Sequence, residues 1–180
     1  FPIQANILET GIGTINTVYS LTKYLENNKK PDLIVNTGCA GAHSDKLQIG
    51  DVVAITHCVF ASNIIIDEKG NSHYYGIRTN NTENNIYIRH TNIIEDEISY
   101  NNSFNVFYGG IASSDIWHQN IKYIEFWNSY FNTFVEDMEA SSIAEIAARN
   151  GIKFIAFKDV SNSIYLPSDF EPFDHIEPQN

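Results

Sequence analysis

The sequence has few basic residues and few cysteines, and it contains no long apolar segment. Its 11 lysines and arginines stand against 22 aspartates and glutamates, which gives a formal net charge of −11 at pH 7. A nucleic-acid partner is therefore not expected, because phosphate binding needs a basic face. A membrane-spanning helix is not expected either, because no run of about 18 uncharged apolar residues is present.

The two cysteines, Cys39 and Cys58, allow at most one disulfide. Both stand among apolar or small residues, which favours buried free thiols in a reducing compartment over a disulfide. The first residues carry neither the basic nor the apolar region of a signal peptide, so a cytoplasmic location is expected. The histidines show no metal-ligand spacing such as HExxH, and no metal or other cofactor is expected.

A length of 180 residues suits one domain with its own core. No repeat and no linker rich in Pro, Gly or Ser divides the chain, and the Asn-rich residues 69–85 predict a solvated loop. Elsewhere, short β-branched runs alternate with amphipathic segments, which predicts an α/β fold with a mainly parallel sheet. Strands are expected at residues 3–8, 32–36, 51–60, 105–108 and 152–160, and helices at residues 14–27 and 137–150.

A further group of aromatic residues has helical spacing and is expected to lie in the core rather than at an interface. The group consists of Tyr123, Phe126, Trp127, Tyr130 and Phe131.

Ligands of such sheets bind at the carboxyl ends of the strands, and five polar or small-residue segments lie at such places. They are residues 10–14, 36–41, 113–118, 136–139 and 157–162. Each alone also fits a structural role: a tight turn, close packing, a core tryptophan or a helix cap. Asp137 and Glu139 are two residues apart and cannot share a helical face, so one is expected to cap the helix while the other points elsewhere.

The order and spacing of these segments resemble the purine nucleoside phosphorylase-I superfamily, and within it the methylthioadenosine/S-adenosylhomocysteine nucleosidases and their relatives. The resemblance covers residues 8 to 162 and is carried by residues 10–13, 36–41, 47–53, 135–140 and 160–162. It implies a three-layer α/β/α fold around a central mixed, mainly parallel sheet.

The resemblance implies that the protein hydrolyses the N-glycosidic bond of a purine nucleoside through an oxocarbenium-like transition state. The implied substrate is methylthioadenosine, S-adenosylhomocysteine or a modified relative, which would place the protein in methionine salvage. Water is the implied nucleophile, a homodimer is the implied assembly, and no cofactor is implied.

The resemblance also implies roles for individual residues. Glu139 would accept hydrogen bonds from the ribose hydroxyls, with Met138 beside the sugar and Ile12 as an apolar wall. Trp117 would stack on the purine, and His118 would contact the substrate beside it. The other implied substrate-binding residues are Cys39, Ala40, Gly41, Asp137 and Ser161.

Asn162 is the implied catalytic residue, and it differs from the family pattern. In the nucleosidases that act on adenine, an aspartate at this place gives a proton to N7 of the leaving base. An amide can donate a hydrogen bond but is no general acid near neutral pH. Asparagine here is similar to 6-oxopurine phosphorylases and to futalosine hydrolases, so the base need not be adenine. The nearby Asp159 is expected on the opposite face of its strand.

The scarcity of arginine favours water over phosphate as the nucleophile. The superfamily's phosphorylases place an arginine where this chain has Asn36, and phosphate needs a cationic partner. The three arginines, Arg78, Arg89 and Arg149, lie away from the glycine motifs. Hydrolysis is therefore the leading prediction, and the alternatives are phosphorolysis and non-catalytic binding or storage of nucleosides.

Two family elements have no match in these residues. The resemblance places the first strand, with the glutamate that activates water, upstream of Phe1, and the final helix beyond Asn180. Residues 1–180 are therefore expected to be the middle of one longer domain that lacks its first strand and last helix.

Overall fold

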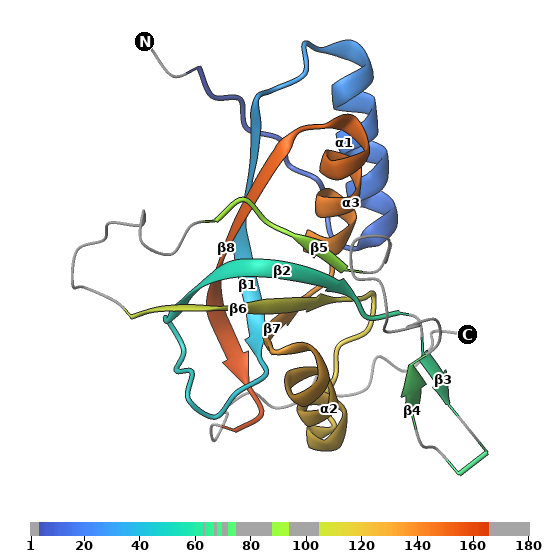
Figure 1. Ribbon diagram of the computed structural model, residues 1–180, viewed down its shortest axis with the longest axis vertical. Coiled ribbons are helices and arrows are strands. Elements are labelled where there is room, and N and C mark those ends of the chain that lie inside the picture. Colours follow the sequence, from blue (N-terminus) through green and yellow to red (C-terminus); the bar gives the residue numbers. More distant parts are fainter. Residues whose placement is uncertain are drawn as a thin grey trace, which may run out of the picture.

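The computed structural model describes residues 4–62, 64–66, 68–69, 72–74, 88–93 and 105–165. Figure 1 shows their arrangement. The helices of this part are α1 (Thr14–Asn27), α2 (Ile121–Phe131) and α3 (Ala140–Asn150). Its strands are β1 (Leu33–Ala42), β2 (Val52–Phe60), β3 (Ile64–Ile66), β4 (Ser72–Tyr74), β5 (Ile88–His90), β6 (Val106–Ser113), β7 (Thr133–Asp137) and β8 (Lys153–Ser163).

The main sheet is mixed and closes on itself. Its strand order is β5-β2-β6-β7-β1-β8, and β2 also pairs with β8. β1 runs parallel to β8, and β6 runs parallel to β2 and β7, whereas the β1–β7 and β2–β8 pairs are antiparallel. One edge of β2 serves two neighbours, since residues 52–54 pair with β8 and residues 57–59 pair with β5. The mixed α/β fold is confirmed, but the sheet forms a barrel, so the predicted three layers are not confirmed.

Most predicted elements are present, with shifts at their ends. The helix at residues 14–27 and the strand at 51–60 are confirmed, the latter starting one residue later. The strands predicted at 32–36, 105–108 and 152–160 all continue further, because β1, β6 and β8 keep pairing through their carboxyl ends. The helix predicted at residues 137–150 is α3, and it begins at Ala140 rather than Asp137 because residues 133–137 form β7.

The strand predicted at residues 3–8 is wrong for the part that the structure describes. Residues 4–8 adopt no regular structure, and all five are exposed. The segment contains the apolar residues Ile7 and Leu8, but among the described residues no strand pairs with it. Residue 3 and most of the Asn-rich segment 69–85 lie outside the described residues.

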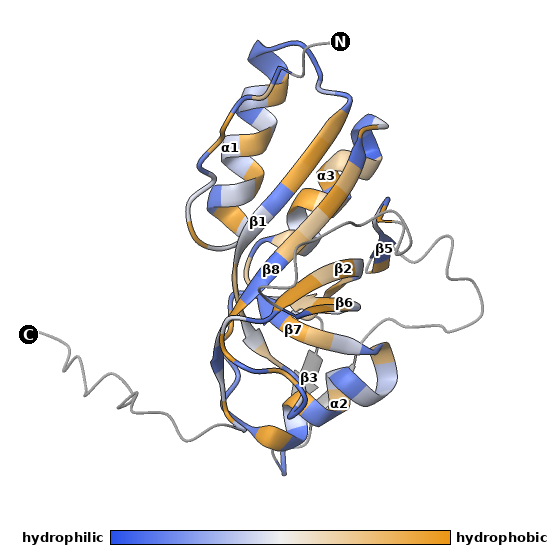
Figure 2. Cartoon of the chain, turned by 90° about the vertical axis from the view of Figure 1, so that its left-hand side faces the viewer, coloured by the Kyte–Doolittle hydropathy of each residue, from blue (hydrophilic) through white to orange (hydrophobic). Residues whose placement is uncertain are grey.

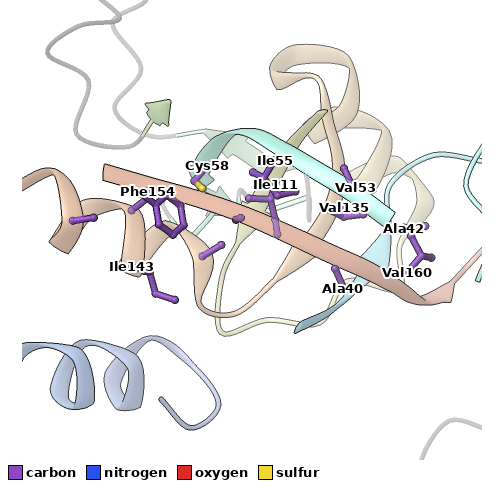
Figure 3. Close-up of a cluster of buried hydrophobic side chains, with 14 of the residues drawn as sticks. Ala40, Ala42, Val53, Ile55, Cys58, Ile111, Val135, Ile143, Phe154 and Val160 are labelled. Atoms are coloured by element: carbon purple, nitrogen blue, oxygen red, sulfur yellow. The ribbon is translucent and has the colours of Figure 1, made fainter. Parts of the chain in front are cut away.

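The hydrophobic core lies inside the barrel and beneath α3 (Figure 3). Val53 and Ile55 of β2, Ile111 of β6 and Val135 of β7 are buried within it. α3 adds apolar side chains to this core, of which Ile143 is labelled in Figure 3.

The predicted aromatic helix is α2. Its Trp127 is fully buried and packs with Tyr123, Val59 and Ala112 in a second cluster. The core placement is thus confirmed for these two aromatic residues, whereas Tyr130 is exposed.

α1 buries one face and exposes another. Thr17 and Leu21 are its buried residues, and α1 lies beside α3 (Figure 1). Ile15 and Tyr19 remain 80% and 64% exposed, and Figure 2 shows α1 at the outer side of the molecule. An apolar helical face is therefore left open to contact.

The two cysteines are free and differ in environment. Cys58 is buried in the core, and burial raises the pKa of its thiol. Cys39 is exposed near the end of β1, so the prediction of a buried thiol is wrong there. No helix in the described ranges is long and apolar enough to cross a membrane.

Candidate active site

The carboxyl ends of β1, β6, β7 and β8 meet at one end of the barrel. The strand register sets Gly41 of β1 beside Glu136 of β7 and Asn162 of β8. On the other side of β7, Ser113 of β6 lies beside Asp137. Four of the five predicted segments therefore converge here, as expected for strand ends that carry a site.

The fifth segment, the glycine loop before α1, is joined to this end by Glu139. The backbone N–H of Gly13 donates to Glu139 Oε1 over 2.7 Å, and the N–H of Thr14 donates to Asp115 Oδ1 over 2.7 Å. Two carboxylates thus occupy the amides at the amino end of α1, where the helix dipole favours negative charge. The loop binds side-chain oxyanions of the protein itself.

Gly13→Ala is expected to lower the free energy of unfolding by about 1–3 kcal/mol. Gly13 has φ +87°, and an added Cβ would meet Asp115 Oδ1 at 3.0 Å. Chemical denaturation measures the loss, with Gly50→Ala as the control: Gly50 has φ +92°, but nothing lies within 4 Å of its added Cβ. Equal losses in the two variants would show that the contact with Asp115 contributes nothing.

Asp137 holds the turn that carries Met138 and Glu139. Its carboxylate accepts from Ser113 Oγ at 2.6 Å, from the N–H of Ala140 at 3.0 Å and from Lys158 Nζ at 2.9 Å. As predicted, one carboxylate caps the helix while the other points elsewhere. The implied substrate contact of Asp137 stays a prediction, since these bonds give it a supporting position beneath the turn.

Glu136 joins two histidines at the same end of the barrel. Its Oε2 lies 2.6 Å from His118 Nδ1 and 3.3 Å from His43 Nε2, and its Oε1 accepts from the backbone N–H of His118. Burial alone would raise the pKa of Glu136, but the hydrogen bonds from His118 and His43 outweigh it and hold that pKa below its ordinary value. Glu136 is therefore ionised at neutral pH.

Asn162 lies against this cluster. A Cβ built on Gly41 would be 3.0 Å from Asn162 Nδ2 and 3.5 Å from Glu136 Oε1. Ser161 Oγ lies 3.0 Å from Asn162 Oδ1, so the amide oxygen accepts from the hydroxyl. Gly41 is required at this point, because a larger side chain would fill the space between the amide and the carboxylate.

A strand irregularity changes the expected relation between Asp159 and Asn162. Their partners on β1 are Cys39 and Gly41, with a register shift after Ala40. The extra residue of β8 at this bulge brings Asp159 and Asn162 to the same face of the sheet. The prediction of opposite faces is wrong, because strict alternation assumes a regular strand.

The remaining predicted site residues differ in burial. Ala40 and Gly41 are buried, whereas Ile12, Cys39 and Trp117 are exposed. Met138 is half-buried between Asp137 and Glu139. Their contacts with a substrate stay predictions.

Two members of the site were not singled out from the sequence. Glu136 is part of the predicted segment 136–139, and His43 is one of the histidines without metal-ligand spacing. His43 lies 93 residues from Glu136 in the chain and contacts it at 3.3 Å. No local pattern signals such a contact; a buried carboxylate at a strand end, which needs partners, is the signal that could have led to it.

Comparisons with known proteins identify a matching family and several similar proteins. The model of the phosphorylase superfamily matches residues 4–179. A 5'-methylthioadenosine/S-adenosylhomocysteine nucleosidase of Bacillus velezensis is 27% identical over 169 residues, which is 93% of this chain and 71% of that protein. The Bacillus subtilis nucleosidase of the same name is also 27% identical, over 87% of this chain and 67% of its own length.

Solved structures show the same fold. The 5'-methylthioadenosine/S-adenosyl homocysteine nucleosidase of Campylobacter jejuni aligns with a TM-score of 0.69 at 19% identity, over 90% of this chain and 69% of that one. A futalosine hydrolase mutant of Helicobacter pylori aligns with a TM-score of 0.67 at 19% identity, over 89% of this chain and 69% of that one. At these identities the structural likeness supports the fold alone.

Proposed function

The chain belongs to the phosphorylase superfamily, and on this basis we propose that it is a nucleosidase that hydrolyses the N-glycosidic bond of a purine nucleoside. The proposed substrate is methylthioadenosine, S-adenosylhomocysteine or a modified relative, as the names of its relatives suggest. A reaction on these substrates would place the protein in methionine salvage. A cytoplasmic location is part of the proposal, because free thiols such as Cys39 and Cys58 suit a reducing compartment.

The placement of Glu139 carries the proposal. One oxygen of its carboxylate is fixed by the N–H of Gly13. A carboxylate has about four lone-pair sites, so this contact leaves capacity for two vicinal ribose hydroxyls. Its negative charge would also stabilise the positive charge that develops on the ribose as the bond to the base breaks.

The charges around the site favour water over phosphate. Asp115 and Glu139 already occupy the amides at the start of α1. Lys158 is buried, and its ammonium group pairs with Asp137. A phosphate ion would meet carboxylates at the loop rather than the cationic partner that it needs.

A panel of purine ribosides tests the proposal. The full-length protein is incubated with each riboside, and the released base is followed by chromatography. Release of base without added phosphate is the expected result. Strict dependence on phosphate would support a phosphorylase, and calorimetric binding without turnover would support a nucleoside-binding or storage protein.

The proposed assembly is a homodimer in which the apolar face of α1 meets a second copy. Ile15 and Tyr19 are exposed on this face, and Val18 between them is 40% exposed. Apolar side chains grouped on one helical face favour contact between proteins. A second copy at this face would lie next to the glycine loop and could close part of the site.

Tyr19→Asp is expected to shift the protein from dimer to monomer, since a charge at the centre of an apolar interface loses its hydration on association. Sedimentation velocity measures the shift. Lys122→Asp, an exposed change on α2, is the control and should stay dimeric. A Tyr19→Asp protein that sediments as the wild type does would place the interface elsewhere.

We also propose that the helices and the central sheet form three layers, in the order α/β/α. α1 and α3 lie beside one another, and α2 packs in a separate cluster through Trp127. Helices on both sides of the strands would form the outer layers around the sheet.

A further inference from the structure

His118 has a ring nitrogen without a partner in a buried place. The residue is 8% exposed, and its Nε2 has no hydrogen-bond partner within the described chain. Its other ring nitrogen, Nδ1, lies 2.6 Å from Glu136 Oε2. A buried polar atom without a partner is costly, so the free nitrogen indicates a place where a ligand atom is expected.

Glu136 determines the state of the ring. An ionised carboxylate can only accept, so Nδ1 must carry the proton of the short contact. When the imidazole takes up a second proton, that proton lies on Nε2, on the side of the ring away from the contact with Glu136. Tyr123 stacks on the His118 ring with centroids 3.8 Å apart and limits its rotation. Carboxylate, histidine and free nitrogen thus have the arrangement of a positioned acid or base.

The same carboxylate lies near both His118 and Asn162, the residue that the resemblance places at the leaving base. Glu136 Oε1 and Asn162 Nδ2 both lie within 3.5 Å of the point where a Cβ on Gly41 would stand. Asn162 cannot protonate a leaving base, because its amide is no acid near neutral pH. A purine that Asn162 contacts would lie beside the group that holds His118.

We propose that His118 is the general acid of the reaction, an inference that rests on the proposed nucleosidase function. As the bond between C1′ and N9 breaks, its electron pair moves to the purine. The imidazolium Nε2–H gives its proton to a ring nitrogen of that purine, which leaves as the neutral base. Water forms the new bond to C1′ and releases a proton to solvent, and solvent returns a proton to His118.

The other titratable groups near His118 have different roles. Glu136 holds the ring, and His43 contacts Glu136 from the other side at 3.3 Å. Burial raises the pKa of Tyr123 to about 12, so its hydroxyl stays neutral at working pH. Asp159 shares the face of β8 with Asn162 and is the rival acid.

His118→Gln tests the proposal on two kinds of substrate. For the best neutral purine riboside, kcat is expected to fall about 100-fold or more, the usual contribution of a general acid. For the 7-methylated counterpart of that riboside, whose base leaves without needing a proton, the loss should be far smaller. The wild-type rate on the neutral substrate should fall as rising pH removes the proton of the acid, and this alkaline limb of the pH profile should be missing in His118→Gln.

Matched variants separate catalysis from support. His43→Gln removes the other partner of Glu136. This variant should keep the alkaline limb of the pH profile, and the ratio of its kcat values on the neutral and the 7-methylated riboside should match that of the wild type. Asn162→Asp added to His118→Gln should restore part of the lost rate. Equal losses on both substrates in His118→Gln, or a loss of the alkaline limb in Asp159→Asn instead, would overturn the role of His118. Wild-type protein that releases no base from any riboside would remove the proposed function itself.

Discussion

Glu139→Gln is expected to reduce kcat/KM for purine ribosides by about 10²–10³-fold, the usual cost of removing one preorganised electrostatic contact from a transition state. The amide oxygen of glutamine can still accept from the N–H of Gly13, so the turn should keep its shape. The loss would come from the missing negative charge and from an NH₂ group that meets ribose hydroxyls as a second donor.

Calorimetry separates the contact with the ribose from a general effect. Binding of ribosides to Glu139→Gln should weaken far more than binding of the free base. Glu125→Gln, on the exposed side of α2, is the control and should leave both affinities unchanged. Equal weakening for riboside and free base would contradict the placement of Glu139 at the ribose.

Lys158→Met is expected to destabilise the protein by about 3–5 kcal/mol, the usual cost of breaking a buried ion pair from one side. Lys158 is 2% exposed, and its Nζ lies 2.9 Å from Asp137 Oδ2. Without the ammonium, Asp137 would keep its charge in the barrel with only neutral donors. A domain that is stable by about 5–15 kcal/mol would lose a large share of its stability.

A double-mutant cycle checks the cause by urea denaturation. Asp137→Asn keeps one oxygen, which can accept from both Ser113 and Ala140, but it removes the charge. Lys158→Met combined with Asp137→Asn should therefore be more stable than Lys158→Met alone. If the two changes add independently, Lys158 acts through packing, and the ion pair has no separate effect.

Local patterns predicted local structure well. The helix at 14–27 was predictable because apolar residues recur at helical spacing after a glycine turn. Gly13 itself could be recognised as a turn residue, but its contact with Glu139 spans 126 residues and has no local signal. The predicted strand at residues 3–8 failed because apolar residues alone do not provide a neighbouring strand.

The closure of the sheet could not be predicted from the same patterns. It depends on β2 pairing with β8 through residues 52–54, and on the register shift beside Ala40. That shift also moved Asn162 to the face of Asp159. Pairing and register are properties of two distant segments, whereas periodicity describes one segment at a time.

The site was predictable as a set of strand ends, and less so as a network. Glu139, Asn162 and His118 lie in these segments, but their individual roles are implied only by the family resemblance and stay predictions. The contacts of Glu136 with His43 and His118 could not be predicted, because burial of the carboxylate creates the need for them and burial is known only from the fold. The acid proposed for the reaction depends on that network.

The sugar product formed in the presence of phosphate tests the central claim most directly. The full-length protein is given the riboside that it cleaves best, in buffer with and without phosphate, and the sugar is analysed by mass spectrometry. Hydrolysis predicts the free sugar in both buffers at the same rate. Formation of the sugar 1-phosphate, with no cleavage when phosphate is left out, would contradict it.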